Sequence, residues 1–134
     1  MNTNLDATTT FKTMQTLSLK IFGEPCSKAN SRKIVKFGNR MASIKSEKAL
    51  GYAESFKRQC NIPASQKFLD DVVVTIRIWY ASRRPDLDES LILDLLQDVA
   101  YVNDRQVKEK HIYWMGVDKL NPRCEIKVQK KASA

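Results

Sequence analysis

The chain has 134 residues, of which 43% are apolar and 28% are charged, and this length and composition fit one globular domain with one hydrophobic core. Its 23 lysines and arginines outnumber its 15 acidic residues, and the net charge of +8 attracts polyanions such as nucleic acid or an anionic membrane surface. No apolar run approaches the roughly 18 residues of a membrane-spanning helix, and the N-terminal residues lack the pattern of a secretory signal, so we expect neither membrane insertion nor secretion.

The first half of the chain predicts a strand, a basic loop or hairpin, and a helix. Residues 17–22 alternate apolar and polar side chains, as a half-buried strand does. The basic stretch 28–40 contains a Gly-Asn turn signal, which predicts an exposed loop or a short hairpin. Residues 43–60 carry an apolar stripe beside lysines and an arginine, which predicts a helix capped by Ser43 or Ser46.

The second half predicts a central strand, a second helix and two closing strands. Residues 71–80 are β-branched or aromatic almost throughout, so we expect them to lie centrally in a sheet. Apolar residues recur at helical spacing from about Asp88 to Val99, and Asn103-Asp104 is a turn signal. Residues 106–116 and 123–128 are expected to form strands.

This order of elements predicts an α+β fold, a single domain in which helices pack on a mixed β-sheet. We expect the domain to span residues 16–129, between a flexible N-terminal tail of residues 1–15 and a basic C-terminal tail of residues 130–134.

An acidic cluster follows the most apolar strand of this otherwise basic chain. In an extended segment Asp86 and Asp88 point to the same side, with Cα atoms roughly 6.5–7 Å apart. If the next helix packs back along the sheet, Asp104 returns to the same end. Three carboxylates would bind a hard cation, and Arg83 and Arg84 would supply a positive rim. Such a group suits a metal-dependent nuclease, in which Mg²⁺ activates water and neutralises developing charge.

The same residues also have purely structural interpretations. Asp86 and Glu89 have the spacing of a helix-capping box, and Asn103-Asp104 can form a simple turn. A helix cap explains neither the flanking arginines nor the third aspartate. A soluble basic protein without a nucleic-acid partner is the remaining alternative.

Several segments of the chain carry a more specific pattern. They are Ile21 to Arg32, which contains Gly23, Pro25, Lys28 and Arg32; Arg84-Pro85-Asp86-Leu87-Asp88; an apolar helix carrying Asp94; Tyr101-Val102-Asn103-Asp104-Arg105-Gln106-Val107; and Asn121-Pro122-Arg123-Cys124-Glu125-Ile126. In this order they resemble the RusA family of Holliday-junction resolvases. The resemblance spans about residues 17–128.

This resemblance implies a RusA-like nuclease domain in which Asp86, Asp88 and Asp104 are the catalytic, metal-binding aspartates. The cofactor would be Mg²⁺, for which Mn²⁺ can substitute. The partner would be branched DNA, above all four-way junctions, which a homodimer resolves by paired symmetric nicks in DNA recombination and repair. Two coordinated cuts suit the near two-fold symmetry of a junction. The implied location is the cytoplasm of a bacterial or phage-infected bacterial cell.

Three departures from the family pattern concern the site itself. Glu89 stands where the family usually has Asn after its second aspartate. The following helix lacks the lysine that the family carries in its first turns, so Lys108, Lys110 or Arg84 would have to serve the phosphate. Asn103 also stands where the family often has Asp.

The basic residues expected to contact DNA phosphates are Lys28, Arg32, Lys33, Lys36, Arg40, Arg83 and Arg84. A solvated charged face is the alternative for any one of them. The alternatives for the whole protein are a nuclease acting on flaps and forks as well, and a non-catalytic DNA-binding protein that retains the fold.

The cysteines and the histidine do not suggest a further site. The chain has three cysteines, Cys26, Cys60 and Cys124, and their spacing is not that of a metal site. An odd number of cysteines indicates reduced thiols, which we expect to form part of the packing. The single histidine, His111, lies in a predicted strand and is expected to be a packed or exposed strand residue rather than a zinc ligand.

Overall fold

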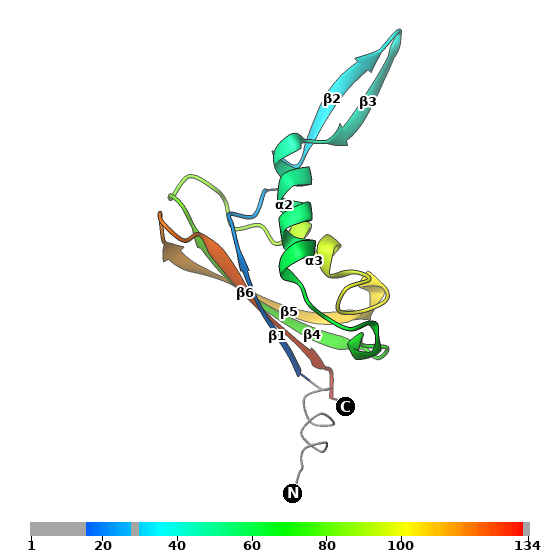
Figure 1. Ribbon diagram of the computed structural model, residues 1–134, viewed down its shortest axis with the longest axis vertical. Helices are drawn as coiled ribbons and strands as arrows, with labels where there is room; N and C mark the ends of the chain where they lie inside the picture. The colour runs from blue at the N-terminus through cyan, green and yellow to red at the C-terminus, as the bar shows by residue number, and fades with distance from the viewer. Residues whose placement is uncertain (1–15, 28–29, 133–134) are drawn as a thin grey trace, which may run out of the picture.

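The computed structural model describes residues 16–27 and 30–132, so the expected N-terminal tail and Lys28 lie outside the described residues. A four-stranded sheet carries the helices, and a separate hairpin extends away from it (Figure 1). The elements are β1 (Thr16–Phe22), β2 (Arg32–Phe37), β3 (Arg40–Lys45), α2 (Glu47–Gln59), the short helix η2 (Ala64–Gln66), β4 (Val72–Tyr80), α3 (Ser90–Leu96), the short helix η3 (Asp104–Gln106), β5 (Val107–Val117) and β6 (Arg123–Lys130).

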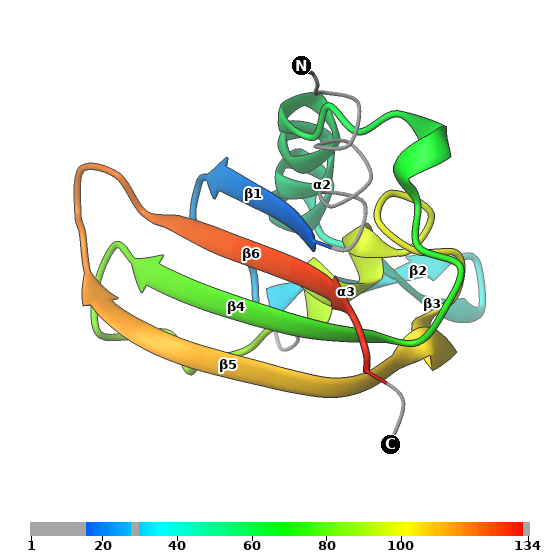
Figure 2. The ribbon, with the colours of Figure 1, turned by 90° about the horizontal axis from the view of Figure 1, so that it is seen from below.

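The sheet is mixed, as predicted, and its strand order is β1-β6-β4-β5. β4 pairs in parallel with β5 and antiparallel with β6, so it is an interior strand, which confirms the prediction made from its composition. Alternate residues of β4 are buried, from Val72 to Tyr80. Figure 2 shows α2 and α3 on the same side of this sheet, the side on which the core forms.

The core is built from one face of each helix and one face of the sheet. α2 contributes Tyr52 and Phe56, and α3 contributes Leu91, Ile92, Leu95 and Leu96. Ser46 caps α2, because its side chain accepts a hydrogen bond from the backbone N–H of Ala49 at 3.2 Å. The other candidate cap, Ser43, lies in β3 and accepts hydrogen bonds from Arg32.

Three elements differ clearly from their predicted bounds. α2 begins at Glu47 rather than near residue 43, because residues 40–45 pair with β2 as strand β3. α3 covers only Ser90–Leu96 rather than residues 88–99, because Gln97 has an extended ψ of 134° and Asp98 follows with a left-handed φ of 68°. At the other end of the chain, β6 continues to Lys130, and the N–H of Lys131 donates to the carbonyl of Asp71. The sheet therefore includes Lys130, which had been expected to begin the C-terminal tail.

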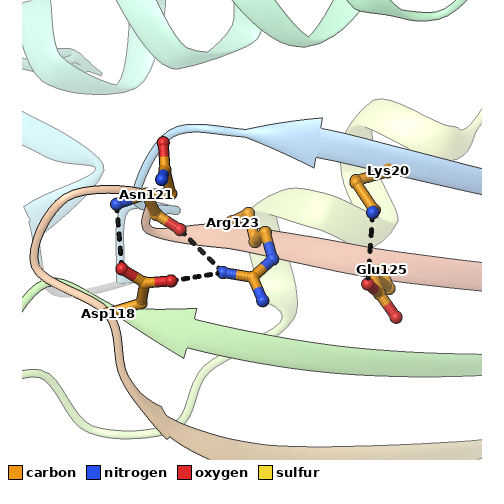
Figure 3. Close-up of polar contacts among 5 residues, drawn as sticks. All are labelled: Lys20, Asp118, Asn121, Arg123 and Glu125. Atoms are coloured by element: carbon orange, nitrogen blue, oxygen red, sulfur yellow. Dashed lines mark hydrogen bonds and ion pairs between the residues drawn. The ribbon is translucent and has the colours of Figure 1, made fainter.

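The turn between β5 and β6 braces the end of β4 (Figure 3). The Asp118 carboxylate accepts a hydrogen bond from the backbone of Asn121 at 3.1 Å and one from Arg123 at 2.8 Å, and these bonds lower the pKa of Asp118. The N–H of Asp118 also donates to the carbonyl of Tyr80 at 2.8 Å. On the opposite sheet face from the helices, the Arg123 guanidinium lies 4.1 Å from the centre of the Trp79 ring.

The three cysteines are free thiols, and Cys26 and Cys124 are buried in the core, as predicted. Burial raises the pKa of Cys60 to about 11 and that of Cys124 to about 12. Across the described part of the chain, no helix is long and apolar enough to span a membrane.

Substitutions of one buried and one exposed isoleucine test this architecture. Ile76 is completely buried at the middle of β4, so Ile76→Ala should lower the free energy of unfolding by about 2–5 kcal/mol. Ile34 is largely exposed on the hairpin, so Ile34→Ala should change it by about 0.5 kcal/mol or less. Urea unfolding of both variants measures the difference, and equal destabilisation would contradict the fold described.

Candidate active site

The segment that follows β4 turns back over the core instead of continuing away from the sheet. Near its start the Arg83 guanidinium lies 5.2 Å from the centre of the Trp114 ring, and at its end Glu89 Oε2 lies 2.6 Å from Lys110 Nζ. Since β5 pairs Trp114 with Ile78 and Lys110 with Val74, residues 83–89 run back along β5, antiparallel to it. We call residues 81–89 the acidic loop, because it carries Asp86, Asp88 and Glu89.

The hydroxyl of Tyr80 holds the acidic loop in place. Tyr80 is 1% exposed, and its hydroxyl donates to the carbonyl of Asp86 and accepts from the N–H of Asp88, both at 3.2 Å. Desolvation by burial raises the pKa of Tyr80, so the phenol stays protonated at neutral pH. A buried hydroxyl needs partners, and this one finds them in the backbone between the two aspartates.

The start of α3 shows which parts of the helix-cap interpretation of the acidic cluster hold. Asp88 Oδ1 accepts a hydrogen bond from the backbone N–H of Ser90 at 2.9 Å, so Asp88 does help to begin the helix. The predicted alternative, a capping box of Asp86 and Glu89, is not formed: Glu89 occupies the N-cap position and makes no side-chain cap bond. The side chain of Glu89 pairs instead with Lys110.

Asp104 lies in a different local setting. It begins η3, which is held by a capping box of Asn103 and Gln106, so the turn expected at Asn103-Asp104 is present. Its N–H donates to Gln97 Oε1 at 3.0 Å. Burial and the negative charge of Asp94 raise the pKa of the Asp104 carboxyl, while a hydrogen bond with the Tyr101 hydroxyl acts in the opposite direction.

The three predicted metal ligands are not gathered into one cluster. Within residues 16–27 and 30–132, no three His, Cys, Asp or Glu side chains lie close enough to hold one metal ion. The reason is the parallel pairing of β4 and β5: Asp104 precedes β5, whose first residue lies opposite Val72, whereas Asp86 and Asp88 follow the far end of β4. The return of the acidic loop reduces this separation, because Glu89 reaches Lys110, opposite Val74.

The donor chemistry of these residues nevertheless fits a hard divalent cation. All candidate ligands are carboxylate oxygens, the type that Mg²⁺ prefers. The pKa of Asp104 is raised first by burial and second by the negative charge of Asp94, so Asp94 lies near enough for like charges to repel. Asp86, Asp88 and Asp104 could therefore hold a cation if the acidic loop and η3 approach each other.

A cleft of about 320 Å³ borders the acidic loop and is lined by Glu24, Pro25, Ser27, Asn30, Lys48, Ser82, Arg84 and Pro85. The carboxylate of Glu24 accepts a hydrogen bond from the N–H of Ala81 at 2.7 Å, which fastens the segment after β1 to the start of the loop. Two cations, Lys48 and Arg84, thus line one cleft that reaches Pro85, the residue before Asp86. This arrangement suits an anionic group such as a phosphate.

The predicted DNA-binding residues fall into two groups. Arg83 and Arg84 belong to the acidic loop, whereas four others, Arg32, Lys33, Lys36 and Arg40, lie on the β2–β3 hairpin. Sequence reasoning missed Lys48 as a neighbour of Arg84, and it missed Tyr80 as the anchor of the loop. The alternation of side chains along β5 could have pointed to Lys110. Lys110 lies two residues before the partly buried Ile112, so both side chains are on the core-facing side of the strand.

A scan of the sequence against protein-family models finds no match, and a search of curated proteins finds no matching sequence.

Removing the Tyr80 hydroxyl should loosen the acidic loop selectively. In Tyr80→Phe, the loss of two hydrogen bonds should make the amides of residues 86–88 exchange with solvent roughly five- to tenfold faster, with β4 unchanged. Hydrogen–deuterium exchange measures this. Tyr101→Phe is the matched control, because its hydroxyl contacts Leu93 and Asp104 and should affect α3 and η3 instead. Equal effects of both variants on the loop would contradict the anchoring role.

Proposed function

We propose that this chain is a Mg²⁺-dependent, structure-specific DNA endonuclease that acts on four-way junctions by paired symmetric nicks. The observation that carries the proposal is the acidic loop. Its two aspartates are fixed by a buried tyrosine beside a cleft with two cations, in a protein of net charge +8. The ordered resemblance to RusA resolvases supports the same activity. Paired cuts require two active sites, so the working form would be a homodimer bound to branched DNA.

In this proposal Asp86, Asp88 and Asp104 hold Mg²⁺ or Mn²⁺, which supplies water activation and charge neutralisation at the phosphate. Arg84 and Lys48 orient the phosphate in the cleft that they line. Tyr80 keeps the first two aspartates in position against the repulsion of their charges. Holding one cation would require η3 and the acidic loop to approach each other on DNA binding.

Lys110 is the best candidate for the cation that α3 lacks. Among Lys108, Lys110 and Arg84, it is Lys110 that pairs with Glu89, the residue directly after Asp88. The short 2.6 Å contact holds its ammonium group at the end of the acidic loop. Glu89 and Lys110 together would therefore replace the Asn and the helix lysine of the family pattern.

Two alternatives stay open to test. A broader nuclease would cut flaps and forks by the same chemistry. A non-catalytic DNA-binding protein would retain the cationic surfaces, and the separation of Asp104 from the acidic loop favours this second candidate.

Cleavage of a labelled four-way junction in Mg²⁺ separates these functions. The unsubstituted chain should make symmetric nicks in the junction and leave a linear duplex of the same sequence intact. Asp86→Asn, Asp88→Asn and Asp104→Asn should each lower cleavage by about 100-fold or more and retain junction binding, because they remove ligands of the cation. Asp70→Asn, at an exposed carboxylate paired with Lys130, is the control and should cleave normally.

Junction binding without cleavage in either Mg²⁺ or Mn²⁺ would refute the nuclease proposal and leave the DNA-binding alternative. Comparable cleavage of flaps and forks would instead broaden the substrate range.

Loss of the Lys110 ammonium should slow the chemical step more than it weakens binding. Lys110→Ala should lower the single-turnover cleavage rate by about 10²–10³-fold, as expected for a charge that stabilises the transition state. Lys110→Arg should recover part of the rate. Lys127→Ala is the matched control, because Lys127 is exposed on β6 and lies on the face of the sheet opposite the helices. Equal rates for the Lys110→Ala and Lys127→Ala variants would remove Lys110 from the proposed site.

A further inference from the structure

The β2–β3 hairpin extends away from the sheet and the helices, beyond the N-terminal end of α2 (Figure 1). Large apolar side chains on it are exposed: Ile34 by 70%, Met41 by 66% and Phe37 by 62%. An isolated two-stranded hairpin is only marginally stable in water, and several exposed apolar side chains gathered on one short element are a common feature of interaction sites. The hairpin therefore has the features of an interaction arm.

The charge of the arm identifies the kind of partner. Residues 32–45 contain five cations and no acidic residue: Arg32, Lys33, Lys36, Arg40 and Lys45. A second copy of the arm would bring five more positive charges against these. Phosphates would neutralise them, so the charge favours a nucleic acid over a self-contact.

The tip of the arm combines apolar and basic groups in a regular way. A two-residue turn of Gly38 and Asn39 closes it, and Gly38 has a φ of 61°, which favours glycine. Beside the turn Phe37 pairs with Arg40, and Lys36 pairs with Met41. Since paired residues share a face, each face of the tip presents one large apolar side chain beside one cation.

The base of the arm is tied to the neighbourhood of the acidic loop. The Ser46 side chain donates to the carbonyl of Asn30 at 2.8 Å, and its N–H donates to the carbonyl of Ser31 at 2.9 Å. Asn30 also lines the cleft that contains Arg84. The base of the arm thus lies beside the part of the candidate active site that the acidic loop forms.

We propose that Phe37 and Met41 form a wedge that inserts between base pairs at the branch point of the DNA, while the adjacent Arg40 and Lys36 hold the flanking phosphates. The inference rests on the proposed function and names how that site would select branched over linear DNA. Apolar side chains on basic arms can separate stacked bases, and a branch point is where stacking is already weakest. The basic residues supply affinity for any DNA, whereas the wedge supplies the preference for a branch.

The test uses the full chain carrying Asp86→Asn, so that the DNA stays intact, and a junction with 2-aminopurine beside the branch point. Binding should raise the 2-aminopurine fluorescence as the base unstacks. Adding Phe37→Ala and Met41→Ala together should abolish this rise and lower the preference for junction over duplex by about tenfold. Phe37→Leu should retain the rise. Ile34→Ala, at an equally exposed position away from the tip, is the matched control and should leave both readouts unchanged.

Removing a basic residue of the arm should change DNA binding in a different way from removing the apolar residues. Lys36→Ala should weaken junction and duplex binding alike and reduce the slope of log affinity against log salt by about 1, without removing the fluorescence rise.

An undiminished fluorescence rise in the double variant would overturn the wedge. So would dissociation of a DNA-free dimer by the same double substitution, measured by sedimentation, because it would assign the tip to a second copy of the chain. Junction cleavage by the unsubstituted chain with no fluorescence rise would reject the wedge alone. A fluorescence rise that depends on Phe37 and Met41, without cleavage in Mg²⁺, would reject the nuclease and keep the wedge.

Discussion

The arrangement of the candidate site depends on one buried hydroxyl. Tyr80 ends the central strand with its side chain in the core, where a phenol without hydrogen-bond partners would be costly. The acidic loop supplies both partners from its backbone, and this requirement draws Asp86 and Asp88 back over the sheet. Two negative side chains are thereby held near a cleft by the same packing that stabilises the fold. The tyrosine binds backbone rather than carboxylate atoms, and the Asp88 carboxylate separately accepts from the N–H of Ser90 at the start of α3.

The second constraint is the balance of charge around the acidic loop. Glu89 is mostly covered, with a side chain that is 19% exposed, and a covered carboxylate needs a cation. Lys110 meets this need from the adjacent strand. A mostly covered Glu at a helix start would be unfavourable without such a partner. The burial of Glu89 and the position of Lys110 are therefore consistent with each other.

The sequence predicted much of the fold because its signals are local. The alternation in residues 17–22, the β-branched run of β4 and the apolar spacing of α3 each reflect which side of an element faces the core. The Gly-Asn turn likewise marks the hairpin. The relation of Asp104 to Asp86 could not be predicted in this way, since it depends on the parallel register of β4 and β5. The neighbours of Lys110 could not be predicted either, since its contact with Glu89 depends on the same register, which pairs Lys110 with Val74.

Charge and position divide the molecule into two kinds of cationic surface. Arg84 and Lys48 line a cleft next to carboxylates, where a phosphate would meet groups fixed by the core. The arm carries five cations in a region without acids, attached to the domain through its base. Phosphate contacts alone do not distinguish a junction from a duplex, since both present the same backbone. A junction differs in where its helices bend apart and expose stacked bases. In the proposed function, selectivity for branched DNA would therefore have to come from shape, and within the described chain the exposed apolar tip of the arm is a feature suited to recognise it.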